Sequence, residues 1–137
     1  MAMFDQFLQF FSILFDLVSQ PSNLLILFAS SFIGILFGAM PGLTATLGIA
    51  LLTTLTYSLN TDTALISLLG MYVGAVYGGS YPAILLNIPG TPAAAATALD
   101  GYPMAKRGEG AKALGLTTTA SLIGTLIGLV FLVVLSP

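Results

Sequence analysis

The stretch GMYVGAVYGGSYPAILLNIPGTP, residues 70–92, decides how this chain folds. It contains a glycine at every fourth position from Gly70 to Gly78, a Gly-Ser step at 79–80 and a Pro-Gly step at 89–90. The sequence around it is almost continuously apolar, so a helix interrupted here would be interrupted inside a membrane. Lipid offers no water to satisfy free backbone groups, and a broken helix therefore lies within protein or beside a wet cavity. We expect breaks at both steps, next to a cavity.

The composition is that of an integral membrane protein. Of the 137 residues, 57% are hydrophobic and 6% are charged, and the mean hydropathy is +1.04. Soluble domains carry about 25% charged residues, so that class is excluded. The three basic residues cannot form the basic face that nucleic-acid binding needs. The absence of cysteine and histidine excludes disulfides, thiol catalysis and the commonest zinc sites.

We divide the chain into an amphipathic N-terminal helix, residues 1–20, and a transmembrane domain, residues 21–137. In the first, polar residues recur at steps of four and three and form one narrow stripe on a helix: Asp5, Gln9, Ser12, Asp16 and Ser19. Helices that lie on membranes usually carry Lys and Arg, whereas this one carries two aspartates, so its stripe faces either protein or the outer leaflet. We expect an interfacial or peripheral helix. No Lys or Arg precedes Lys106, which argues against a cleavable signal peptide.

The transmembrane domain is a series of apolar helices separated by turns. Its first span covers residues 24–40 and ends in a glycine ladder (34, 38 and 42), which lets another backbone approach closely. A Pro-Gly break at 41–42 separates this span from an apolar helix at 43–59, and the clearest span is residues 113–135. The predicted fold is therefore all-α, with Pro-Gly-broken or re-entrant segments.

A charged connection lies before the last span. A helix of small residues at 93–99 is expected to end at 100–103, where Asp, Gly and Pro occur together. The basic residues follow at Lys106, Arg107 and Lys112. Short loops rich in Lys and Arg stay in the cytoplasm. We therefore expect a cytoplasmic loop at about 100–112.

Four motifs together identify a family. They are the Pro-Gly step at 41–42, YGGS at 77–80, ILLNIPG at 84–90 and DGYPMAKRG at 100–108. With these motifs, residues 24–135 closely resemble the large membrane subunit of the tripartite tricarboxylate transporters, which are bacterial secondary carriers. Such subunits are several times longer than this chain. The resemblance therefore implies the N-terminal portion of a larger transporter.

The resemblance also implies what the protein does. It implies a multi-pass protein of the bacterial inner membrane that takes up carboxylates such as citrate. It implies two protein partners, a small membrane subunit and a periplasmic substrate-binding protein, and coupling to an ion gradient, either sodium or proton. We expect no cofactor and no enzymatic activity, because the sequence has no H-E-x-x-H, no G-x-S-x-G and no pair of carboxylates within an apolar span.

The candidate binding residues lie at the breaks. Discontinuous helices form the sites of secondary transporters, so we expect both Pro-Gly breaks to aim helix N-termini into a cavity. No Lys or Arg lies within the apolar spans, so backbone N–H groups and polar side chains would hold a carboxylate or a coupling cation. The candidate substrate-binding residues are Gly42, Thr44, Thr46, Gly79, Ser80, Asn87, Gly90 and Thr91.

Other interpretations stay open. Each hydroxyl can cap a helix or bond to its own helix, and the glycines and prolines can serve close packing or kinks alone. The chain can also be a structural membrane subunit that packs through its glycine ladders and transports nothing.

Overall fold

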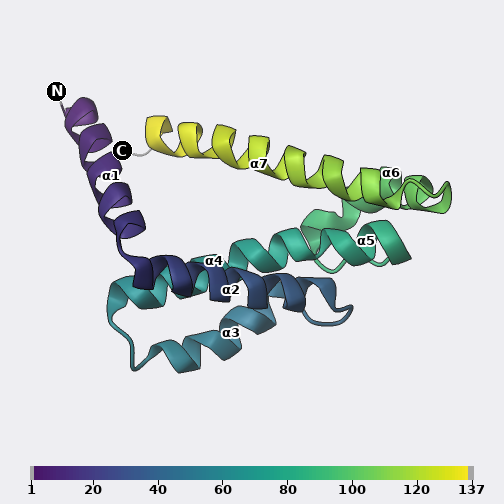
Figure 1. Ribbon diagram of the computed structural model, residues 1–137, viewed down its shortest axis with the longest axis horizontal. Coiled ribbons are helices and arrows are strands. Elements are labelled where there is room, and N and C mark those ends of the chain that lie inside the picture. Colours follow the sequence, from purple (N-terminus) through teal and green to yellow (C-terminus); the bar gives the residue numbers. More distant parts are fainter. Residues whose placement is uncertain (1, 136–137) are drawn as a thin grey trace.

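The computed structural model describes residues 2–135, with the side chains of residues 2–7 and 18 left out. Over these residues the chain is helical apart from turns and short connections (Figure 1). The elements in chain order are α1 Ala2–Ser19, α2 Pro21–Ala39, α3 Ala45–Thr56, α4 Thr61–Gly78, α5 Ser80–Leu86, the 3-10 turn η1 Pro92–Ala94, α6 Ala95–Lys106 and α7 Gly110–Leu135. The prediction of an all-α membrane protein is confirmed.

Three helical segments are long and apolar enough to cross a membrane: Pro21–Ala39, Thr61–Leu86 and Gly110–Leu135. By contrast, α3 has 12 residues and is therefore about 18 Å long at 1.5 Å per residue. A bilayer core is about 30 Å thick, so α3 cannot span it. The apolar helix expected at 43–59 is thus shorter than predicted.

The N-terminal helix α1 leaves the rest of the molecule at its junction with α2 (Figure 1). Gln20 is extended and Pro21 is the first residue of α2, where its missing N–H is not needed. In the predicted polar stripe, Gln9, Ser12, Asp16 and Ser19 are exposed, and the side chain of Asp5 lies outside the described residues. Large apolar side chains of α1 are exposed as well, including Phe15 at 74%, so both faces of this helix are uncovered.

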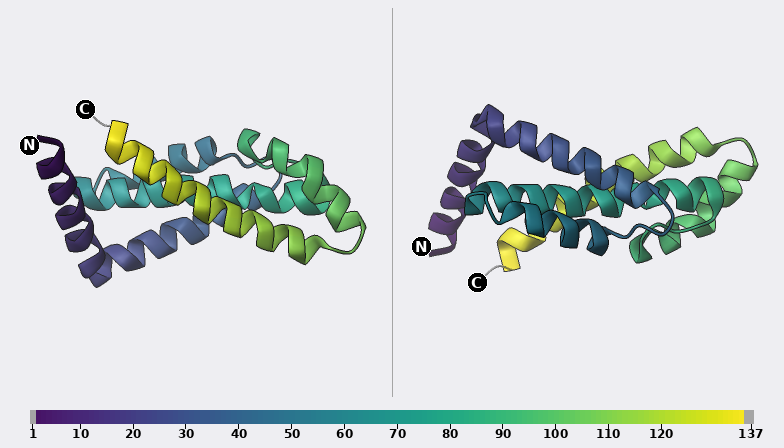
Figure 2. Two further views of the ribbon diagram at one scale, coloured as in Figure 1. Left: turned by 90° about the horizontal axis from the view of Figure 1, so that it is seen from above. Right: turned by 90° about the horizontal axis from the view of Figure 1, so that it is seen from below.

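The two glycine ladders pack α2 against α4, and these helices run side by side in the same direction (Figures 1 and 2). A Cβ atom at Gly34 would collide with the carbonyl oxygen of Met71, and one at Gly74 would collide with that of Ser31. The backbones are therefore in direct contact, as the ladders predicted. Gly42 takes no part in this contact, because no atom lies within 4 Å of the space where its Cβ would be.

The break expected at Gly79-Ser80 is absent, and this prediction is wrong. Gly79 has helical backbone angles, φ −60° and ψ −18°, and its N–H donates to the Ala75 carbonyl at 3.1 Å. The helix therefore continues from α4 through α5. Glycine is needed here for space, because a Cβ at this position would lie 2.7 Å from Thr91 Oγ1 and 2.9 Å from its backbone nitrogen.

The actual interruption is the connection between α5 and η1. Asn87 ends α5 in the left-handed conformation at φ 57°, and the Ile88 N–H donates to the Pro82 carbonyl at 3.1 Å. The chain then turns back along α5 until the Gly90 N–H donates to the Gly79 carbonyl at 3.2 Å. It thus re-enters the span at the level of Gly79, which confirms the re-entrant segment expected near Pro89-Gly90.

From this level α6 runs alongside α5 in the same direction. Ala83 of α5 packs against Ala94 and Ala98, and all three are buried. Further along, a Cβ atom at Gly101 would lie 2.7 Å from Ile84 Cγ1. Small side chains therefore let the re-entrant helix lie close to the helix it follows.

The helix end expected at 100–103 is also wrong, because α6 continues to Lys106 with Pro103 inside it. Gly101 is present for packing on Ile84 rather than for a turn. Only residues 107–109 lie between α6 and α7, so the connection is shorter than the 100–112 loop of the prediction. That this end faces the cytoplasm stays a prediction.

The last helix, α7, returns across the molecule as the expected span. It contacts α6 and α5 near its start and then crosses α4 obliquely in the view from above (Figure 2). At its glycines 124 and 128, no atom lies within 4 Å of the place where a Cβ would be. The far part of α7 therefore stands away from α4, and a cleft lies between them.

Candidate functional site

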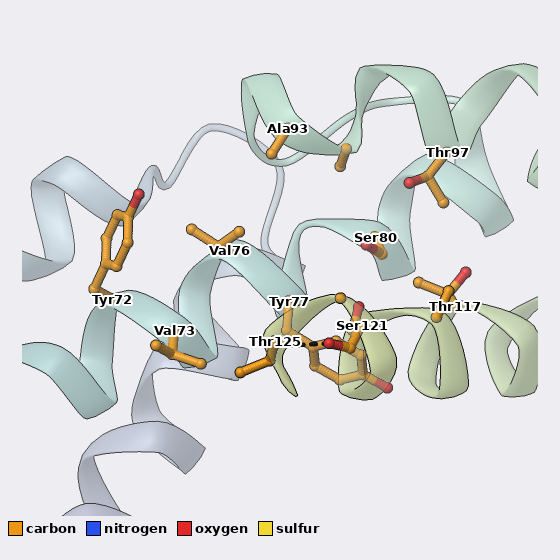
Figure 3. Close-up of a pocket in the computed structure, with 13 residues that line it drawn as sticks. Tyr72, Val73, Val76, Tyr77, Ser80, Ala93, Thr97, Thr117, Ser121 and Thr125 are labelled. Atoms are coloured by element: carbon orange, nitrogen blue, oxygen red, sulfur yellow. Dashed lines mark hydrogen bonds between the residues drawn. The ribbon is translucent and has the colours of Figure 1, made fainter. Parts of the chain in front are cut away.

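A cleft of about 580 Å³ lies where α4, α5, the η1–α6 segment and α7 meet (Figure 3). Its walls are apolar side chains interrupted by hydroxyl groups. The lining residues with hydroxyls are Tyr72, Tyr77, Ser80, Thr97, Thr117, Ser121 and Thr125. No charged side chain is among the described residues that line it. The cleft therefore offers hydrogen bonds and oxygen lone pairs without net charge.

Four of these hydroxyls have no hydrogen-bond partner among the described residues: those of Tyr72, Ser80, Thr97 and Ser121. Ser80 is only 8% exposed, so its free hydroxyl is committed to the cleft rather than to bulk water. Thr117 and Thr125 donate to carbonyls of their own helix at 3.0 and 2.7 Å. A hydroxyl oxygen that donates still has lone pairs, and these two can therefore act as acceptors toward the cleft.

Tyrosines fix one wall of the cleft. The Tyr77 and Thr118 hydroxyls are 2.5 Å apart and connect α4 to α7. The Tyr81 hydroxyl donates to that of Tyr77 at 3.5 Å, and the two rings pack edge to face with centroids 5.6 Å apart. Because α4 and α7 share few other contacts, this hydroxyl pair sets the distance between the walls.

Thr91 is not among the residues that line the cleft, and its hydroxyl is the one buried side-chain group without a partner in the described part of the chain. It is 5% exposed, and its Oγ1 is fully buried without a hydrogen-bond partner. Leaving a buried hydroxyl unpaired costs about 1–3 kcal/mol. The hydroxyl packs on Gly79, and the neighbouring Gly90 packs on both Gly79 and Gly38. The backbones of α2, the α4–α5 junction and the segment before η1 therefore come into direct contact here, because each has a glycine at this point.

The eight predicted binding residues do not form one cluster. Gly79, Ser80, Gly90 and Thr91 come together at the re-entrant segment. Gly42 and Thr44 lie in the exposed connection between α2 and α3, and Thr46 is exposed in the first turn of α3. Thr44 Oγ1 accepts the Leu47 N–H at 3.2 Å and lies 2.7 Å from Thr46 Oγ1, so this pair caps α3.

Asn87 is separate from both groups. It is exposed and forms the left-handed end of α5, where the N–H of the next residue, Ile88, donates to the Pro82 carbonyl. Asparagine tolerates this conformation better than most residues. The backbone alone therefore accounts for an asparagine at this position.

Sequence reasoning missed Thr97, Thr117 and Ser121. All three lie in segments that were treated only as apolar helix, yet 117, 121 and 125 follow one another at steps of four along α7. Side chains four apart share a helix face. A search for hydroxyl stripes inside the spans would have found this face.

Comparison with known proteins identifies the family. The family model described as tripartite tricarboxylate transporter TctA family matches residues 24–137. An uncharacterised 52.8 kDa protein in the TAR-I ttuC′ 3′ region of Agrobacterium vitis is 37% identical over 123 residues, which is 90% of this chain. The chain spans 24% of the length of that relative. No solved structure gives a significant match. Since the family match covers well over half of the sequence, this chain belongs to the tripartite tricarboxylate transporter TctA family.

Proposed function

We propose that the chain is part of the membrane permease of a tripartite secondary transporter that takes up tricarboxylates or related carboxylates. In this proposal it acts in the bacterial inner membrane with a small membrane subunit and a periplasmic substrate-binding protein, and an ion gradient drives uptake. Family membership supports the transport class. The re-entrant segment supports a transport site within this chain.

The observation that carries the proposal is the buried, unpaired hydroxyl of Thr91. It lies beside Gly79, about 10 Å from the Leu86 end of a 26-residue apolar span. An interrupted backbone at such a depth is tolerated where it is buried in protein or borders water. The chain keeps an unsatisfied donor here at a cost in stability, which a polar ligand would offset.

The chemistry of this region suits recognition by dipoles. Ser80 and Thr91 can donate their hydroxyl hydrogens to carboxylate oxygens, and hydrogen bonds to a charged group are worth about 1.5–3 kcal/mol. Gly79 and Gly90 carry no side chains, so the two backbones lie next to each other and bring Thr91 close to Ser80. These four residues are the part of the predicted set that we assign to substrate.

The structural alternative, packing through glycine ladders, finds less support. The glycines of the α2 and α4 ladders already pack against each other within this chain. They are therefore not available to a separate partner subunit. Only α7 presents helical glycines to open space among the described residues, at positions 115, 124 and 128.

Uptake of labelled citrate by cells that produce the complete transporter tests the proposal. We expect Ser80→Ala and Thr91→Val to raise the KM for citrate by about tenfold or more, the effect of losing one hydrogen bond to a charged group. Thr119→Val is the matched control, because its hydroxyl bonds only to its own helix and does not line the cleft. Parental kinetics in both test variants, at equal amounts in the membrane, would remove this region from the substrate site.

A further inference from the structure

A second cleft continues the first one toward the charged end of the molecule. It has a volume of about 260 Å³ and lies between α6 and α7. The two clefts share Thr97, Thr117 and Ala120 in their walls. Together they form one path, which we call the α6–α7 lane, from Ser80 at the start of α5 to Asp100 in the middle of α6.

Asp100 is the one acidic residue that lines either cleft among the described residues. It is exposed, and it forms no salt bridge within the part of the chain that the structure describes. The neighbouring basic groups are engaged elsewhere. Arg107 Nε and Lys112 Nζ lie 3.7 and 3.5 Å from the Glu109 carboxylate, and Lys106 Nζ lies 4.9 Å from the centre of the Tyr102 ring. The Asp100 carboxylate is therefore free to attract a cation into the lane.

The lining of the lane favours a monovalent cation. Near Asp100 the carboxylate would repel an anion and attract a cation. Calcium and magnesium sites usually combine several oxygens with more than one carboxylate, whereas this lane has a single acid. Beyond Asp100 it presents the hydroxyl oxygens of Thr97, Thr117 and Ser121, before the Ser80 hydroxyl that we assign to substrate. Such neutral oxygens can replace water around a weakly held ion of charge +1.

We propose that the α6–α7 lane binds a monovalent cation that enters past Asp100 and is held by the hydroxyl oxygens between α6 and α7. The inference rests on the proposed function, because the cation supplies the positive charge that a bound carboxylate needs. No Lys or Arg of the chain lies in the apolar part of a span or near Ser80. Substrate at Ser80 and Thr91 and cation in the lane would then be neighbours, and each would strengthen the binding of the other.

Cysteine labelling tests the cation site without requiring transport. The chain has no cysteine, so a single introduced thiol can be followed in a transporter background without other cysteines. Ala120→Cys places the thiol where the two clefts meet and leaves every hydroxyl in place. With a cationic methanethiosulfonate reagent, we expect labelling to be slower in sodium chloride than in choline chloride at equal ionic strength.

Two controls sharpen this experiment. Leu122→Cys puts the thiol on the same helix outside both clefts, and sodium should not change its labelling. Asp100→Asn should raise the sodium concentration for half-maximal protection severalfold, because it removes the one carboxylate among the described residues of the lane. Asp62→Asn, an exposed acid at the start of α4 and outside the lane, should leave that concentration unchanged.

The outcomes separate the cation site from carboxylate transport. Equal labelling rates of Ala120→Cys in sodium and choline would overturn the inference. So would protection of the thiol by sodium that is the same with and without Asp100→Asn, or a labelling rate that changes with pH but not with sodium. Citrate uptake in the same cells tests the transport function on its own. If citrate is not taken up but sodium still protects Ala120→Cys, then the proposed substrate is wrong and the cation site stands. If citrate uptake is normal in Asp100→Asn at limiting sodium, then the cation site is wrong.

Discussion

The two Pro-Gly steps of this chain have the same sequence and opposite environments. Each follows a ladder of glycines. The step at 41–42 comes after the end of α2, and the step at 89–90 comes after the end of α5, which continues α4. Pro41 and Gly42 lie exposed in a turn, where the Leu43 N–H donates to the Met40 carbonyl at 3.1 Å. Pro89 and Gly90 lead the chain back into the protein, and Gly90 is buried against Gly38 and Gly79.

This difference shows that one dipeptide can serve two physical purposes. Gly42 is needed for its backbone conformation, since its φ of +94° is unfavourable for residues with a Cβ atom, and the space around it is empty. Gly90 is needed for its missing side chain, because the Gly38 carbonyl oxygen occupies the place where a Cβ would be. The first glycine allows the turn that follows α2, whereas the second brings three backbones together.

The largest effect is expected from Gly90→Ala. The added methyl would meet the Gly38 carbonyl and lie 2.9 Å from Gly79 Cα, and neither backbone atom can rotate away. We expect a loss of about 3 kcal/mol in the free energy of unfolding, with a lower thermal midpoint in detergent and a lower yield in the membrane. A normal thermal midpoint would show that the re-entrant segment is not packed as described.

A smaller loss is expected from Gly42→Ala at the other step. The methyl has open space, so only the backbone conformation costs energy, about 1–2 kcal/mol. Gly115→Ala is the control, because Gly115 also has open space but lies in a helix. Alanine there should stabilise the protein by up to about 1 kcal/mol. If both variants had the same thermal midpoint, conformation would not be the reason for glycine at position 42.

Threonine-to-valine changes at the two steps should act in opposite ways. Thr44→Val removes the cap of α3 and should cost about 1 kcal/mol of stability while leaving the KM for citrate unchanged. Thr91→Val removes an unpaired buried hydroxyl and should leave stability equal or higher by about 1 kcal/mol, while the KM for citrate rises. Thermal midpoints and uptake, measured on both variants, would contradict the comparison if Thr91→Val lost stability and kept its KM.

The smallest effect is expected from Asn87→Gly. Its left-handed φ of 57° suits glycine at least as well as asparagine, so the free energy of unfolding should change by about 0.5 kcal/mol or less. Citrate uptake should remain at the parental level if Asn87 only ends α5. Asn87→Ala separates the two roles, since it adds conformational strain and removes the same amide. A loss of uptake in both variants would assign the amide of Asn87 to the site.

Much of the fold follows from the sequence, and the errors share one cause. The apolar spans and the re-entrant segment near Pro89 were predictable, because lipid admits only helices and proline removes a donor. The predicted breaks at Gly79 and at 100–103 were wrong. Glycine can interrupt a helix or let another chain approach it, and the two uses look the same in a local sequence. Only the neighbours, Thr91 and Ile84, show that both glycines serve packing.

The candidate site was predictable to a similar extent. Ser80 and Thr91 were found because they adjoin unusual backbone signals, and the structure places them together. Thr97, Thr117 and Ser121 were missed, since a single hydroxyl inside a helix can face a cleft or its own carbonyls, and only the step of four from 117 to 125 marked a shared face on α7. Thr117 in fact does both, because it donates to Ala113 and lines the cleft.

By itself the sequence determined that this chain is an all-α membrane protein and that it belongs to the tripartite tricarboxylate transporter TctA family, because hydropathy and motifs are local properties. Only the tertiary structure decided which Pro-Gly step is a surface turn and which is buried, and which hydroxyls share a cleft with Asp100. These outcomes depend on which segments lie within a few ångströms of one another. Contacts between α2, the re-entrant segment and α7 join residues far apart in the chain, and backbone sterics at those contacts fix the arrangement.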